Sequence, residues 1–484
     1  MRQRAVLVAV VVTAMAIALV GQFSGGGSAA TKPDQPTKQE LAKKLLATRG
    51  LQLTPAARAF VARVAAGGER AAEPEGAEAR AKAGAATAAG PAVRLAGPGL
   101  RNVRVNAPAR DRHQQDQTTQ SETTIAVAGR NVAVGYNDSQ QSLLFTTQGS
   151  SLSGYSYSRD GGRTFTDGGP LPNRPGYVNL GDPWLTSDRA DRMYYATLAA
   201  TPNFNLGVSV ARSTNGGRSW TVAYAARHSL LEGCSFTQYL GAQPILDPAS
   251  GTLYVAAERF QVDDPQCQGA ELVTSEVIFK STDAGRTFGP AVKIADITPA
   301  GTSETAAGPA ILLGPGKAMR TAEFPVLAFH RDALYVAWNE ARGDHSHLRL
   351  ARSTDAGATW SLRWLTGGNA DEAQPALSGD REGLHVLYYS IAPTRPNRLI
   401  DVAVLDSTNG STFSARRVTN RSFPGVLNIQ QFDPLIAPYY MGDYIANVSD
   451  GRRQYFAWGD NRDRIRNWLY PNGRHDPNVY FARR

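Results

Sequence analysis

Three short stretches of this sequence combine carboxylates with arginine or tyrosine, the side chains that move protons and hold charged substrates. They are Trp338–Asp344, Met441–Tyr444 and Trp458–Arg462. An Asp can protonate a leaving oxygen, an Arg can bind a carboxylate through two hydrogen bonds, and a Tyr activated by a Glu can attack a sugar. Together these groups suit a glycosidase that acts on an acidic sugar. The candidate catalytic residues are Asp182, Glu340 and Tyr444.

Two of these clusters also have a structural explanation. Glu340 with Arg342, and Asp460 with Arg462, can form salt bridges within one predicted loop. His345 and His347 resemble a metal pair, although a solvated loop is the favoured interpretation. We expect no metal in the active site and no organic cofactor.

One eight-residue pattern recurs along the chain and defines its structural unit. Its copies are Ser158–Phe165, Ser213–Trp220, Ser281–Phe288, Ser353–Trp360 and a shorter Ser407–Phe413. The third residue of each full copy is Asp160, Asn215, Asp283 or Asp355. Such a residue bonds backbone amides two residues on, and the following Gly supplies the positive φ of a tight reversal. A β-rich run precedes each copy, so each copy predicts a strand, a turn and a strand.

The copies resemble the Asp-box, or bacterial neuraminidase (BNR) repeat, of the sialidase superfamily. This resemblance covers residues 101–484 and implies an all-β fold, a six-bladed β-propeller with the repeat on the outer hairpin of a blade. It implies an exo-acting glycoside hydrolase, sialidase-like, whose partner is a carbohydrate or glycoconjugate.

Active sialidases share an Arg-Ile-Pro element on the first inner strand, which supplies one arginine of the clamp that holds the sugar carboxylate. The corresponding stretch here is Ser121–Ile125, which contains no Arg. The alternative function is therefore a non-catalytic propeller that binds a glycan or a protein at the cell surface.

A second pattern, a polar residue followed by a β-rich run, marks six predicted innermost strands, and a further β-rich run follows each. The polar residues are Glu122, Asp182, Gln243, Glu323, Gln374 and Asp433. They are expected at the axial mouth, where they form a site or cap loop amides. Arg101–Asn106 is expected to complete the last blade and close the ring. The candidate substrate-binding residues are Glu122, Arg342, Asp433, Asp460 and Arg462.

The first hundred residues differ in kind from the rest. Arg2 and Arg4 precede an apolar run over residues 5–20, followed by small and polar residues. This pattern predicts a signal peptide over residues 1–30 and a secreted, extracellular protein, with an uncleaved membrane anchor as the alternative. Residues 31–100 are predicted to form a short helical segment and then a disordered, Ala/Gly-rich linker.

Composition narrows the set of partners. The net charge of +9 is spread along the chain without aromatic residues interleaved with basic ones, so no nucleic acid is expected. After the N-terminal segment no stretch is apolar enough to span a membrane, and a monomer is expected. In an exported protein, Cys234 and Cys267 are expected to form a disulfide. Asp263 and Asp264 are candidate ligands of a structural calcium ion.

Overall fold

The computed structural model describes residues 99–108, 119–138, 151–187, 191–200, 206–227, 236–247, 249–262, 273–282, 288–300, 303–305, 308–315, 317–393, 398–425, 441–466 and 471–484. The predicted signal peptide and nearly all of the predicted linker lie outside these ranges. So do several residues named above: Cys234, Cys267, Asp263, Asp264, Asp283 and Asp433.

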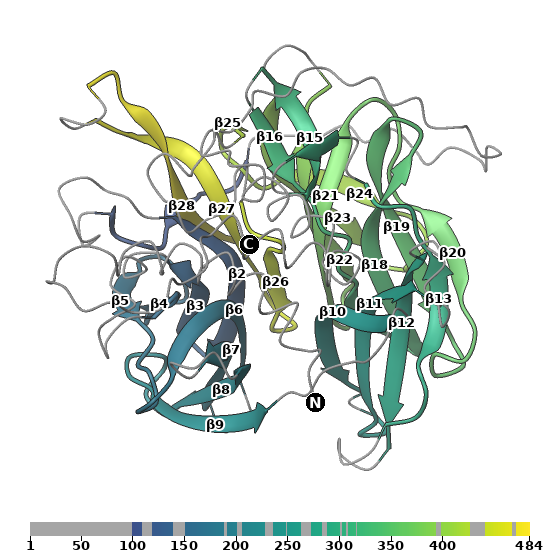
Figure 1. Cartoon of the computed structure of the whole chain (residues 1–484), viewed down its shortest axis with the longest axis horizontal. Coiled ribbons are helices and arrows are strands. Elements are labelled where there is room, and N and C mark those ends of the chain that lie inside the picture. Colours follow the sequence, from purple (N-terminus) through teal and green to yellow (C-terminus); the bar gives the residue numbers. More distant parts are fainter. Residues whose placement is uncertain are drawn as a thin grey trace, which may run out of the picture.

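The described chain forms a six-bladed β-propeller, as predicted (Figure 1). Each blade is an antiparallel sheet whose strands follow one another from the axis outward. The first blade contains β2 (Gln120–Ala128), β3 (Asn131–Asp138), β4 (Ser153–Ser158) and β5 (Thr166–Pro170). The second contains β6 (Val178–Ser187), β7 (Met193–Ala200), β8 (Leu206–Ser213) and β9 (Thr221–Arg227). The third contains β10 (Phe236–Leu246), β11 (Leu253–Val262), β12 (Val273–Ser281) and β13 (Val292–Asp296).

The other three blades follow the same order. The fourth contains β17 (Val326–His330), β18 (Ala333–Arg342), β19 (His345–Ser353) and β20 (Ser361–Trp364). The fifth contains β21 (Asp371–Gly379), β22 (Leu384–Ile391), β23 (Leu399–Ser407) and β24 (Ser414–Arg417), with β25 (Phe423–Pro424) also paired to β23. The sixth contains β26 (Ala446–Ser449), β27 (Gln454–Ile465), β28 (Arg474–Arg483) and β1 (Val103–Arg104).

The ring closes through the two ends of the described chain, as predicted for Arg101–Asn106. Val103 pairs with Phe481 across β1 and β28. The Val105 amide donates to the Val479 carbonyl at 2.8 Å, and the Asn106 side chain accepts the Val479 amide at 2.9 Å. Closure through β1 covers the strand edge that β28 would otherwise expose.

Apolar side chains from neighbouring blades form the cores. Leu185, Met193 and Tyr195 of the second blade pack on Ala126 and Ala133 of the first. Equivalent clusters join the fourth blade to the fifth and the fifth to the sixth. This packing follows from alternation along strands that are covered on both faces.

The recurring pattern lies between the third and fourth strands of a blade. In its first copy the Ser158 hydroxyl accepts the Gly162 amide at 2.9 Å, and Asp160 accepts the Thr164 amide at 3.1 Å. Gly162 has a φ of +80°, as the turn chemistry requires. The same serine-to-glycine contact recurs at Ser213 and Ser353. The strand–turn–strand prediction is confirmed for these copies.

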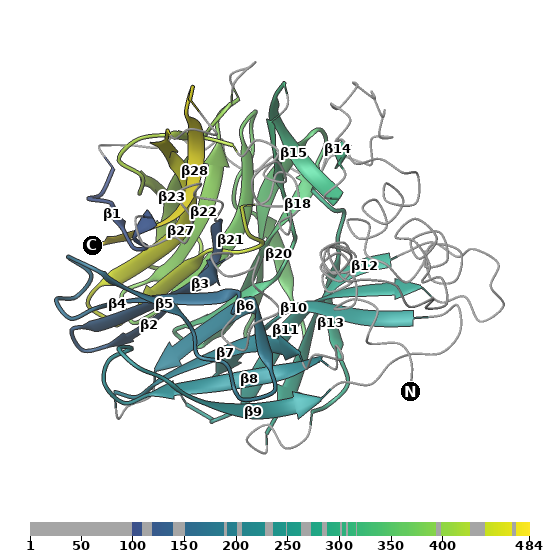
Figure 2. The same cartoon turned by 60° about the vertical axis from the view of Figure 1, so that its left-hand side comes forward.

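Two features differ from the sequence prediction. The sequence placed the innermost strand of the sixth blade after Asp433 and thus before Met441–Tyr444, whereas among the described residues the innermost strand is β26, which follows that segment. A three-stranded sheet also follows the third blade in the sequence; it lies at the top of the molecule in Figure 2, and its Ile311, Leu313 and Met319 pack on the fifth and sixth blades. It consists of β14 (Ser303–Thr305), β15 (Gly308–Gly314) and β16 (Lys317–Arg320). Within the described residues, no helix has the length and apolarity needed to cross a membrane.

Candidate active site

Three polar residues within the innermost strands occupy strained backbone positions. Glu122, Asp182 and Gln374 have φ values of +52°, +54° and +49°, in the left-handed region that non-glycine residues avoid. At each of these residues the pairing register with the neighbouring strand shifts. Such strain costs about 1–3 kcal/mol per residue and clusters at functional sites. The strain therefore marks the axial mouth as the place to look for a site.

Three of the predicted mouth residues hold backbone groups. Gln243 accepts the Leu327 amide of the next blade at 2.6 Å. Glu323 accepts the Ala300 amide at 2.9 Å, and Gln374 donates to the Gly442 carbonyl at 2.6 Å. These three residues therefore cap backbone amides and carbonyls, which is the structural alternative stated above.

The Met441–Tyr444 segment crosses the mouth and joins several blades. Asp443 forms an ion pair with Arg320 at 2.8 Å, and the Tyr444 hydroxyl donates to the Pro183 carbonyl at 3.1 Å. Gly442 has a φ of +93°, and a Cβ atom there would lie 2.6 Å from the Glu122 amide nitrogen. Only glycine fits this approach, so the segment is held against the first, second and fifth blades.

This segment brings Asp443 close to Asp182. The Asp182 side chain keeps accessible surface, yet the surrounding protein strips much of its hydration. Burial, followed by the charge of Asp443, raises the pKa of Asp182 to about 6. Asp182 also forms a hydrogen bond with the Glu122 carboxyl, and two carboxyl groups that bond to each other need a proton between them. Asp182 is therefore a proton donor under mildly acidic conditions.

Three more buried carboxyl groups, Glu323, Glu258 and Glu276, interact electrostatically with Asp443 or with one another. Burial raises the pKa of Glu323 to about 7, and the charge of Asp443 adds to the shift. Glu258 and Glu276 face each other across β11 and β12 and are buried. Burial and the neighbouring carboxylates raise the pKa values of both well above the ordinary range. Neither oxygen of the Glu276 carboxyl has a hydrogen-bond partner among the described residues. In all three groups, burial favours the neutral form of the carboxyl group.

The described residues contain no group of three or more His, Cys, Asp or Glu side chains arranged to hold a metal ion. His345 and His347 lie on β19, where they contact Asp371 at 3.3 Å and Glu372 at 2.8 Å. His347 is buried, so the expectation that this pair lies in a solvated loop is wrong for His347.

Glu340 and Arg342 lie at the end of β18 rather than on a loop. Glu340 forms its ion pair with Arg349 of β19 at 3.0 Å, and the Trp338 indole donates to it at 3.1 Å. Arg342 and Arg349 both stack on Trp364, at 5.1 and 4.9 Å from the ring centroid. The predicted salt bridge within one loop is replaced by a pair between neighbouring strands.

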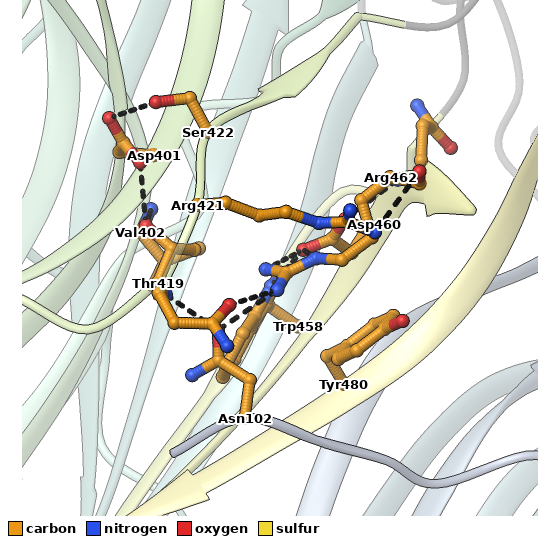
Figure 3. Close-up of polar contacts among 12 residues, drawn as sticks. Asn102, Asp401, Val402, Thr419, Arg421, Ser422, Trp458, Asp460, Arg462 and Tyr480 are labelled. Carbon is orange, nitrogen blue, oxygen red and sulfur yellow. Dashed lines mark hydrogen bonds and ion pairs between the residues drawn. The ribbon is translucent and has the colours of Figure 1, made fainter. Parts of the chain in front are cut away.

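Asp460 and Arg462 form a buried ion pair at 2.6 Å (Figure 3). The Arg462 guanidinium also donates to Asn102 at 3.1 Å and lies over the Tyr480 ring at 4.3 Å. Because Asn102 immediately precedes β1, these contacts tie the closing strand to the sixth blade. They account for the burial of both charges without a ligand.

Sequence reasoning missed several residues at the mouth: Arg320, Glu258, Glu276 and the role of Asp443. A signal existed for Asp443, since it precedes β26 by three residues, as Glu323 precedes β17. Glu258 and Glu276 stand in β-rich runs without a motif, and only the register of β11 and β12 brings them together. Arg320 comes from the unforeseen sheet.

Comparison with known proteins gives structural matches alone. No protein-family model and no curated protein sequence matches this chain. The chain is similar to the α-L-arabinofuranosidase Arb93A of Fusarium graminearum, with 11% identity, a TM-score of 0.43, and 80% of this chain and 98% of that one covered. For Trypanosoma rangeli sialidase the identity is 10%, the TM-score 0.44, and the coverage 81% and 60%. For the Penicillium chrysogenum α-L-arabinanase the identity is 13%, the TM-score 0.42, and the coverage 79% of this chain and 98% of that one.

Proposed function

We propose that this chain is a glycoside hydrolase whose reacting groups are Asp182 and Asp443 at the axial mouth. The observation that supports this proposal is the approach of two carboxyl groups from separate blades, one of which raises the pKa of the other. In glycosidases, two carboxyl groups typically have different surroundings that shift their pKa values apart, so that one acts as the acid and the other as the base or nucleophile. The strained backbone at Asp182 adds to this support.

In this proposal Asp182 is the general acid. Its pKa of about 6 keeps it protonated in mildly acidic solution, and its accessible surface lets it reach a leaving oxygen. The proton of Asp182 moves to the glycosidic oxygen as the bond between that oxygen and the anomeric carbon breaks.

Asp443 is the second carboxyl group. Burial raises its pKa, and the Arg320 guanidinium at 2.8 Å opposes that shift and favours the ionised form. Its Oδ1 atom has no hydrogen-bond partner among the described residues. An ionised Asp443 either removes a proton from the attacking water, which inverts the anomeric centre, or attacks that centre itself, which retains its configuration.

Hydrolysis of a fluorogenic panel tests the proposal. The panel contains α-sialosides, the substrates of the exo-acting sialidase-like enzyme expected from the sequence, together with neutral glycosides and uronides. We expect turnover of at least one substrate, reduced at least a hundredfold in Asp182→Asn and Asp443→Asn and unchanged in the exposed turn variant Asp332→Asn. Turnover that survives both substitutions would refute the assignment. Export of the chain from the cell stays a prediction and is tested by fractionation.

A binding propeller without catalysis is the second candidate. The contacts of Gln243, Glu323 and Gln374 with backbone groups favour it, because these mouth residues serve the scaffold. A glycan array supports this candidate if the chain binds a saccharide that it never cleaves.

A further inference from the structure

An aromatic pair neighbours the pair of carboxyl groups in the sequence of both segments. Trp184 follows Asp182 by two residues, and Tyr444 follows Asp443 by one. The rings of Trp184 and Tyr444 lie 6.4 Å apart, centroid to centroid, at an interplanar angle of 55°. The same two chain segments therefore supply both the carboxyl pair and the aromatic pair.

The contacts of both segments fix this aromatic pair in place. The Tyr444 hydroxyl donates to the carbonyl of Pro183, the residue that separates Asp182 from Trp184. Leu185, the next residue, is buried in the core between the first two blades and anchors the strand. Trp184 and Tyr444 both keep part of their surface exposed. Rigid, partly exposed rings beside polar groups are typical of sites that bind an amphipathic ligand.

The charges at the mouth restrict the ligand. Asp182, Glu122, Glu323 and Asp443 supply carboxyl groups, whereas Arg320 already forms an ion pair with Asp443. Arg342 stacks on Trp364, and Arg462 is buried against Asp460. A sugar carboxylate at this part of the mouth would therefore compete with Asp443 for Arg320, whereas an uncharged sugar would not.

We propose that Trp184 and Tyr444 form a stacking platform for an uncharged sugar ring, and that this platform directs the enzyme to neutral glycans rather than sialosides. The inference rests on the proposed hydrolase activity for its orientation, because the platform would set the glycosidic oxygen beside Asp182. Tyr444 then acts through its ring and its contact with Pro183, in place of the nucleophile role expected from the sequence.

The test measures binding and turnover separately in the full chain. Binding of neutral oligosaccharides (arabinose, xylose, galactose, glucose and mannose series) and of sialyllactose is measured by saturation-transfer NMR and calorimetry in Asp182→Asn. We expect a neutral saccharide to bind more tightly than sialyllactose. Adding Trp184→Ala should weaken that binding at least tenfold, whereas adding Trp184→Phe should change it less than threefold. Thermal melts of each variant distinguish loss of binding from loss of folding.

Kinetics then separate the platform from the nucleophile. We expect Trp184→Ala to raise KM for the neutral substrate more than it lowers kcat, and Tyr444→Phe to keep kcat within tenfold of the wild-type value. Loss of kcat by more than a thousandfold in Tyr444→Phe would overturn the platform and restore the nucleophile. Tighter binding of sialyllactose than of every neutral saccharide would overturn it as well. Neutral binding that depends on Trp184 without any turnover would keep the platform and refute the hydrolase.

Discussion

Replacing Arg462 with Met tests whether the Asp460–Arg462 pair secures the closure of the ring. The substitution keeps an unbranched side chain over Tyr480 but removes the bonds to Asp460, Asn102 and Asn420. Asp460 then keeps the Trp458 indole at 2.9 Å and the residue 462 amide at 2.8 Å, both neutral donors. A buried carboxylate that has lost its cation destabilises the fold by about 3–5 kcal/mol.

The loss of stability caused by Arg462→Met depends on pH. Burial already raises the pKa of Asp460, and Arg462 opposes that shift, so its removal raises the pKa further. A raised pKa means that ionisation of Asp460 in the folded state destabilises the fold. The destabilisation is therefore smaller in acidic solution, where Asp460 is protonated, and grows as the pH rises above the ordinary range of an aspartate.

Urea denaturation, followed by tryptophan fluorescence at pH 4.5 and 7.5, measures this effect. Asp460→Asn combined with Arg462→Met removes the orphaned charge and should restore at least half of the loss at pH 7.5. Arg381→Met, at an exposed turn, serves as the matched control and should stay within about 0.5 kcal/mol of the wild type. A loss that is equal at both pH values, or that the double substitution deepens, would refute the reasoning.

Three further predictions concern the closing strand, the recurring turn and the buried carboxyl pair. Asn106→Ala leaves the Val479 amide without its acceptor and should lower the free energy of unfolding by about 1–3 kcal/mol in urea denaturation; an unchanged value would contradict the closure. Gly162→Ala should lower the melting temperature more than Gly169→Ala. Both glycines have positive φ, but only at Gly162 would a Cβ atom clash, since it would lie 2.2 Å from a Phe481 carbon. Equal decreases in melting temperature would contradict this packing. Glu276→Gln should raise the melting temperature at pH 8 and change it little at pH 4. The pKa of Glu276 is raised in the folded chain, so its ionisation destabilises the fold at pH values above the pKa of about 4.5 in the unfolded chain. Thermal melts that show the same rise in melting temperature at both pH values would contradict this.

The blades were predictable because their signals are local. Each turn copy carries its own Asp or Asn, Gly and aromatic residue, and Trp220 packs at its turn against Tyr155 and Tyr195, at 5.8 and 5.7 Å. The pairing of Val103 with Phe481 spans nearly the whole described chain, yet counting strands sufficed to predict it, because one blade was one strand short.

The site was harder to predict because its partners come from distant segments. Asp443 contacts Arg320, and Glu258 faces Glu276, through register and ring geometry that no local pattern encodes. The clusters of acid and arginine that stood out in the sequence, at Glu340 and Asp460, lie in strands and form ion pairs within their own blades. Local charge pairing and catalytic pairing have the same signature in a sequence.

The most direct measurement is the pH–rate profile of glycoside hydrolysis for the wild type and Asp182→Asn, on the best substrate of the panel. With Asp182 as the general acid, kcat should fall as the pH rises above about 6, because the proton that this group donates is then lost. In Asp182→Asn this limb should vanish along with at least 99% of the rate. A wild-type rate that rises through pH 6 to 8, or a variant that keeps the wild-type profile, would contradict the assignment of Asp182.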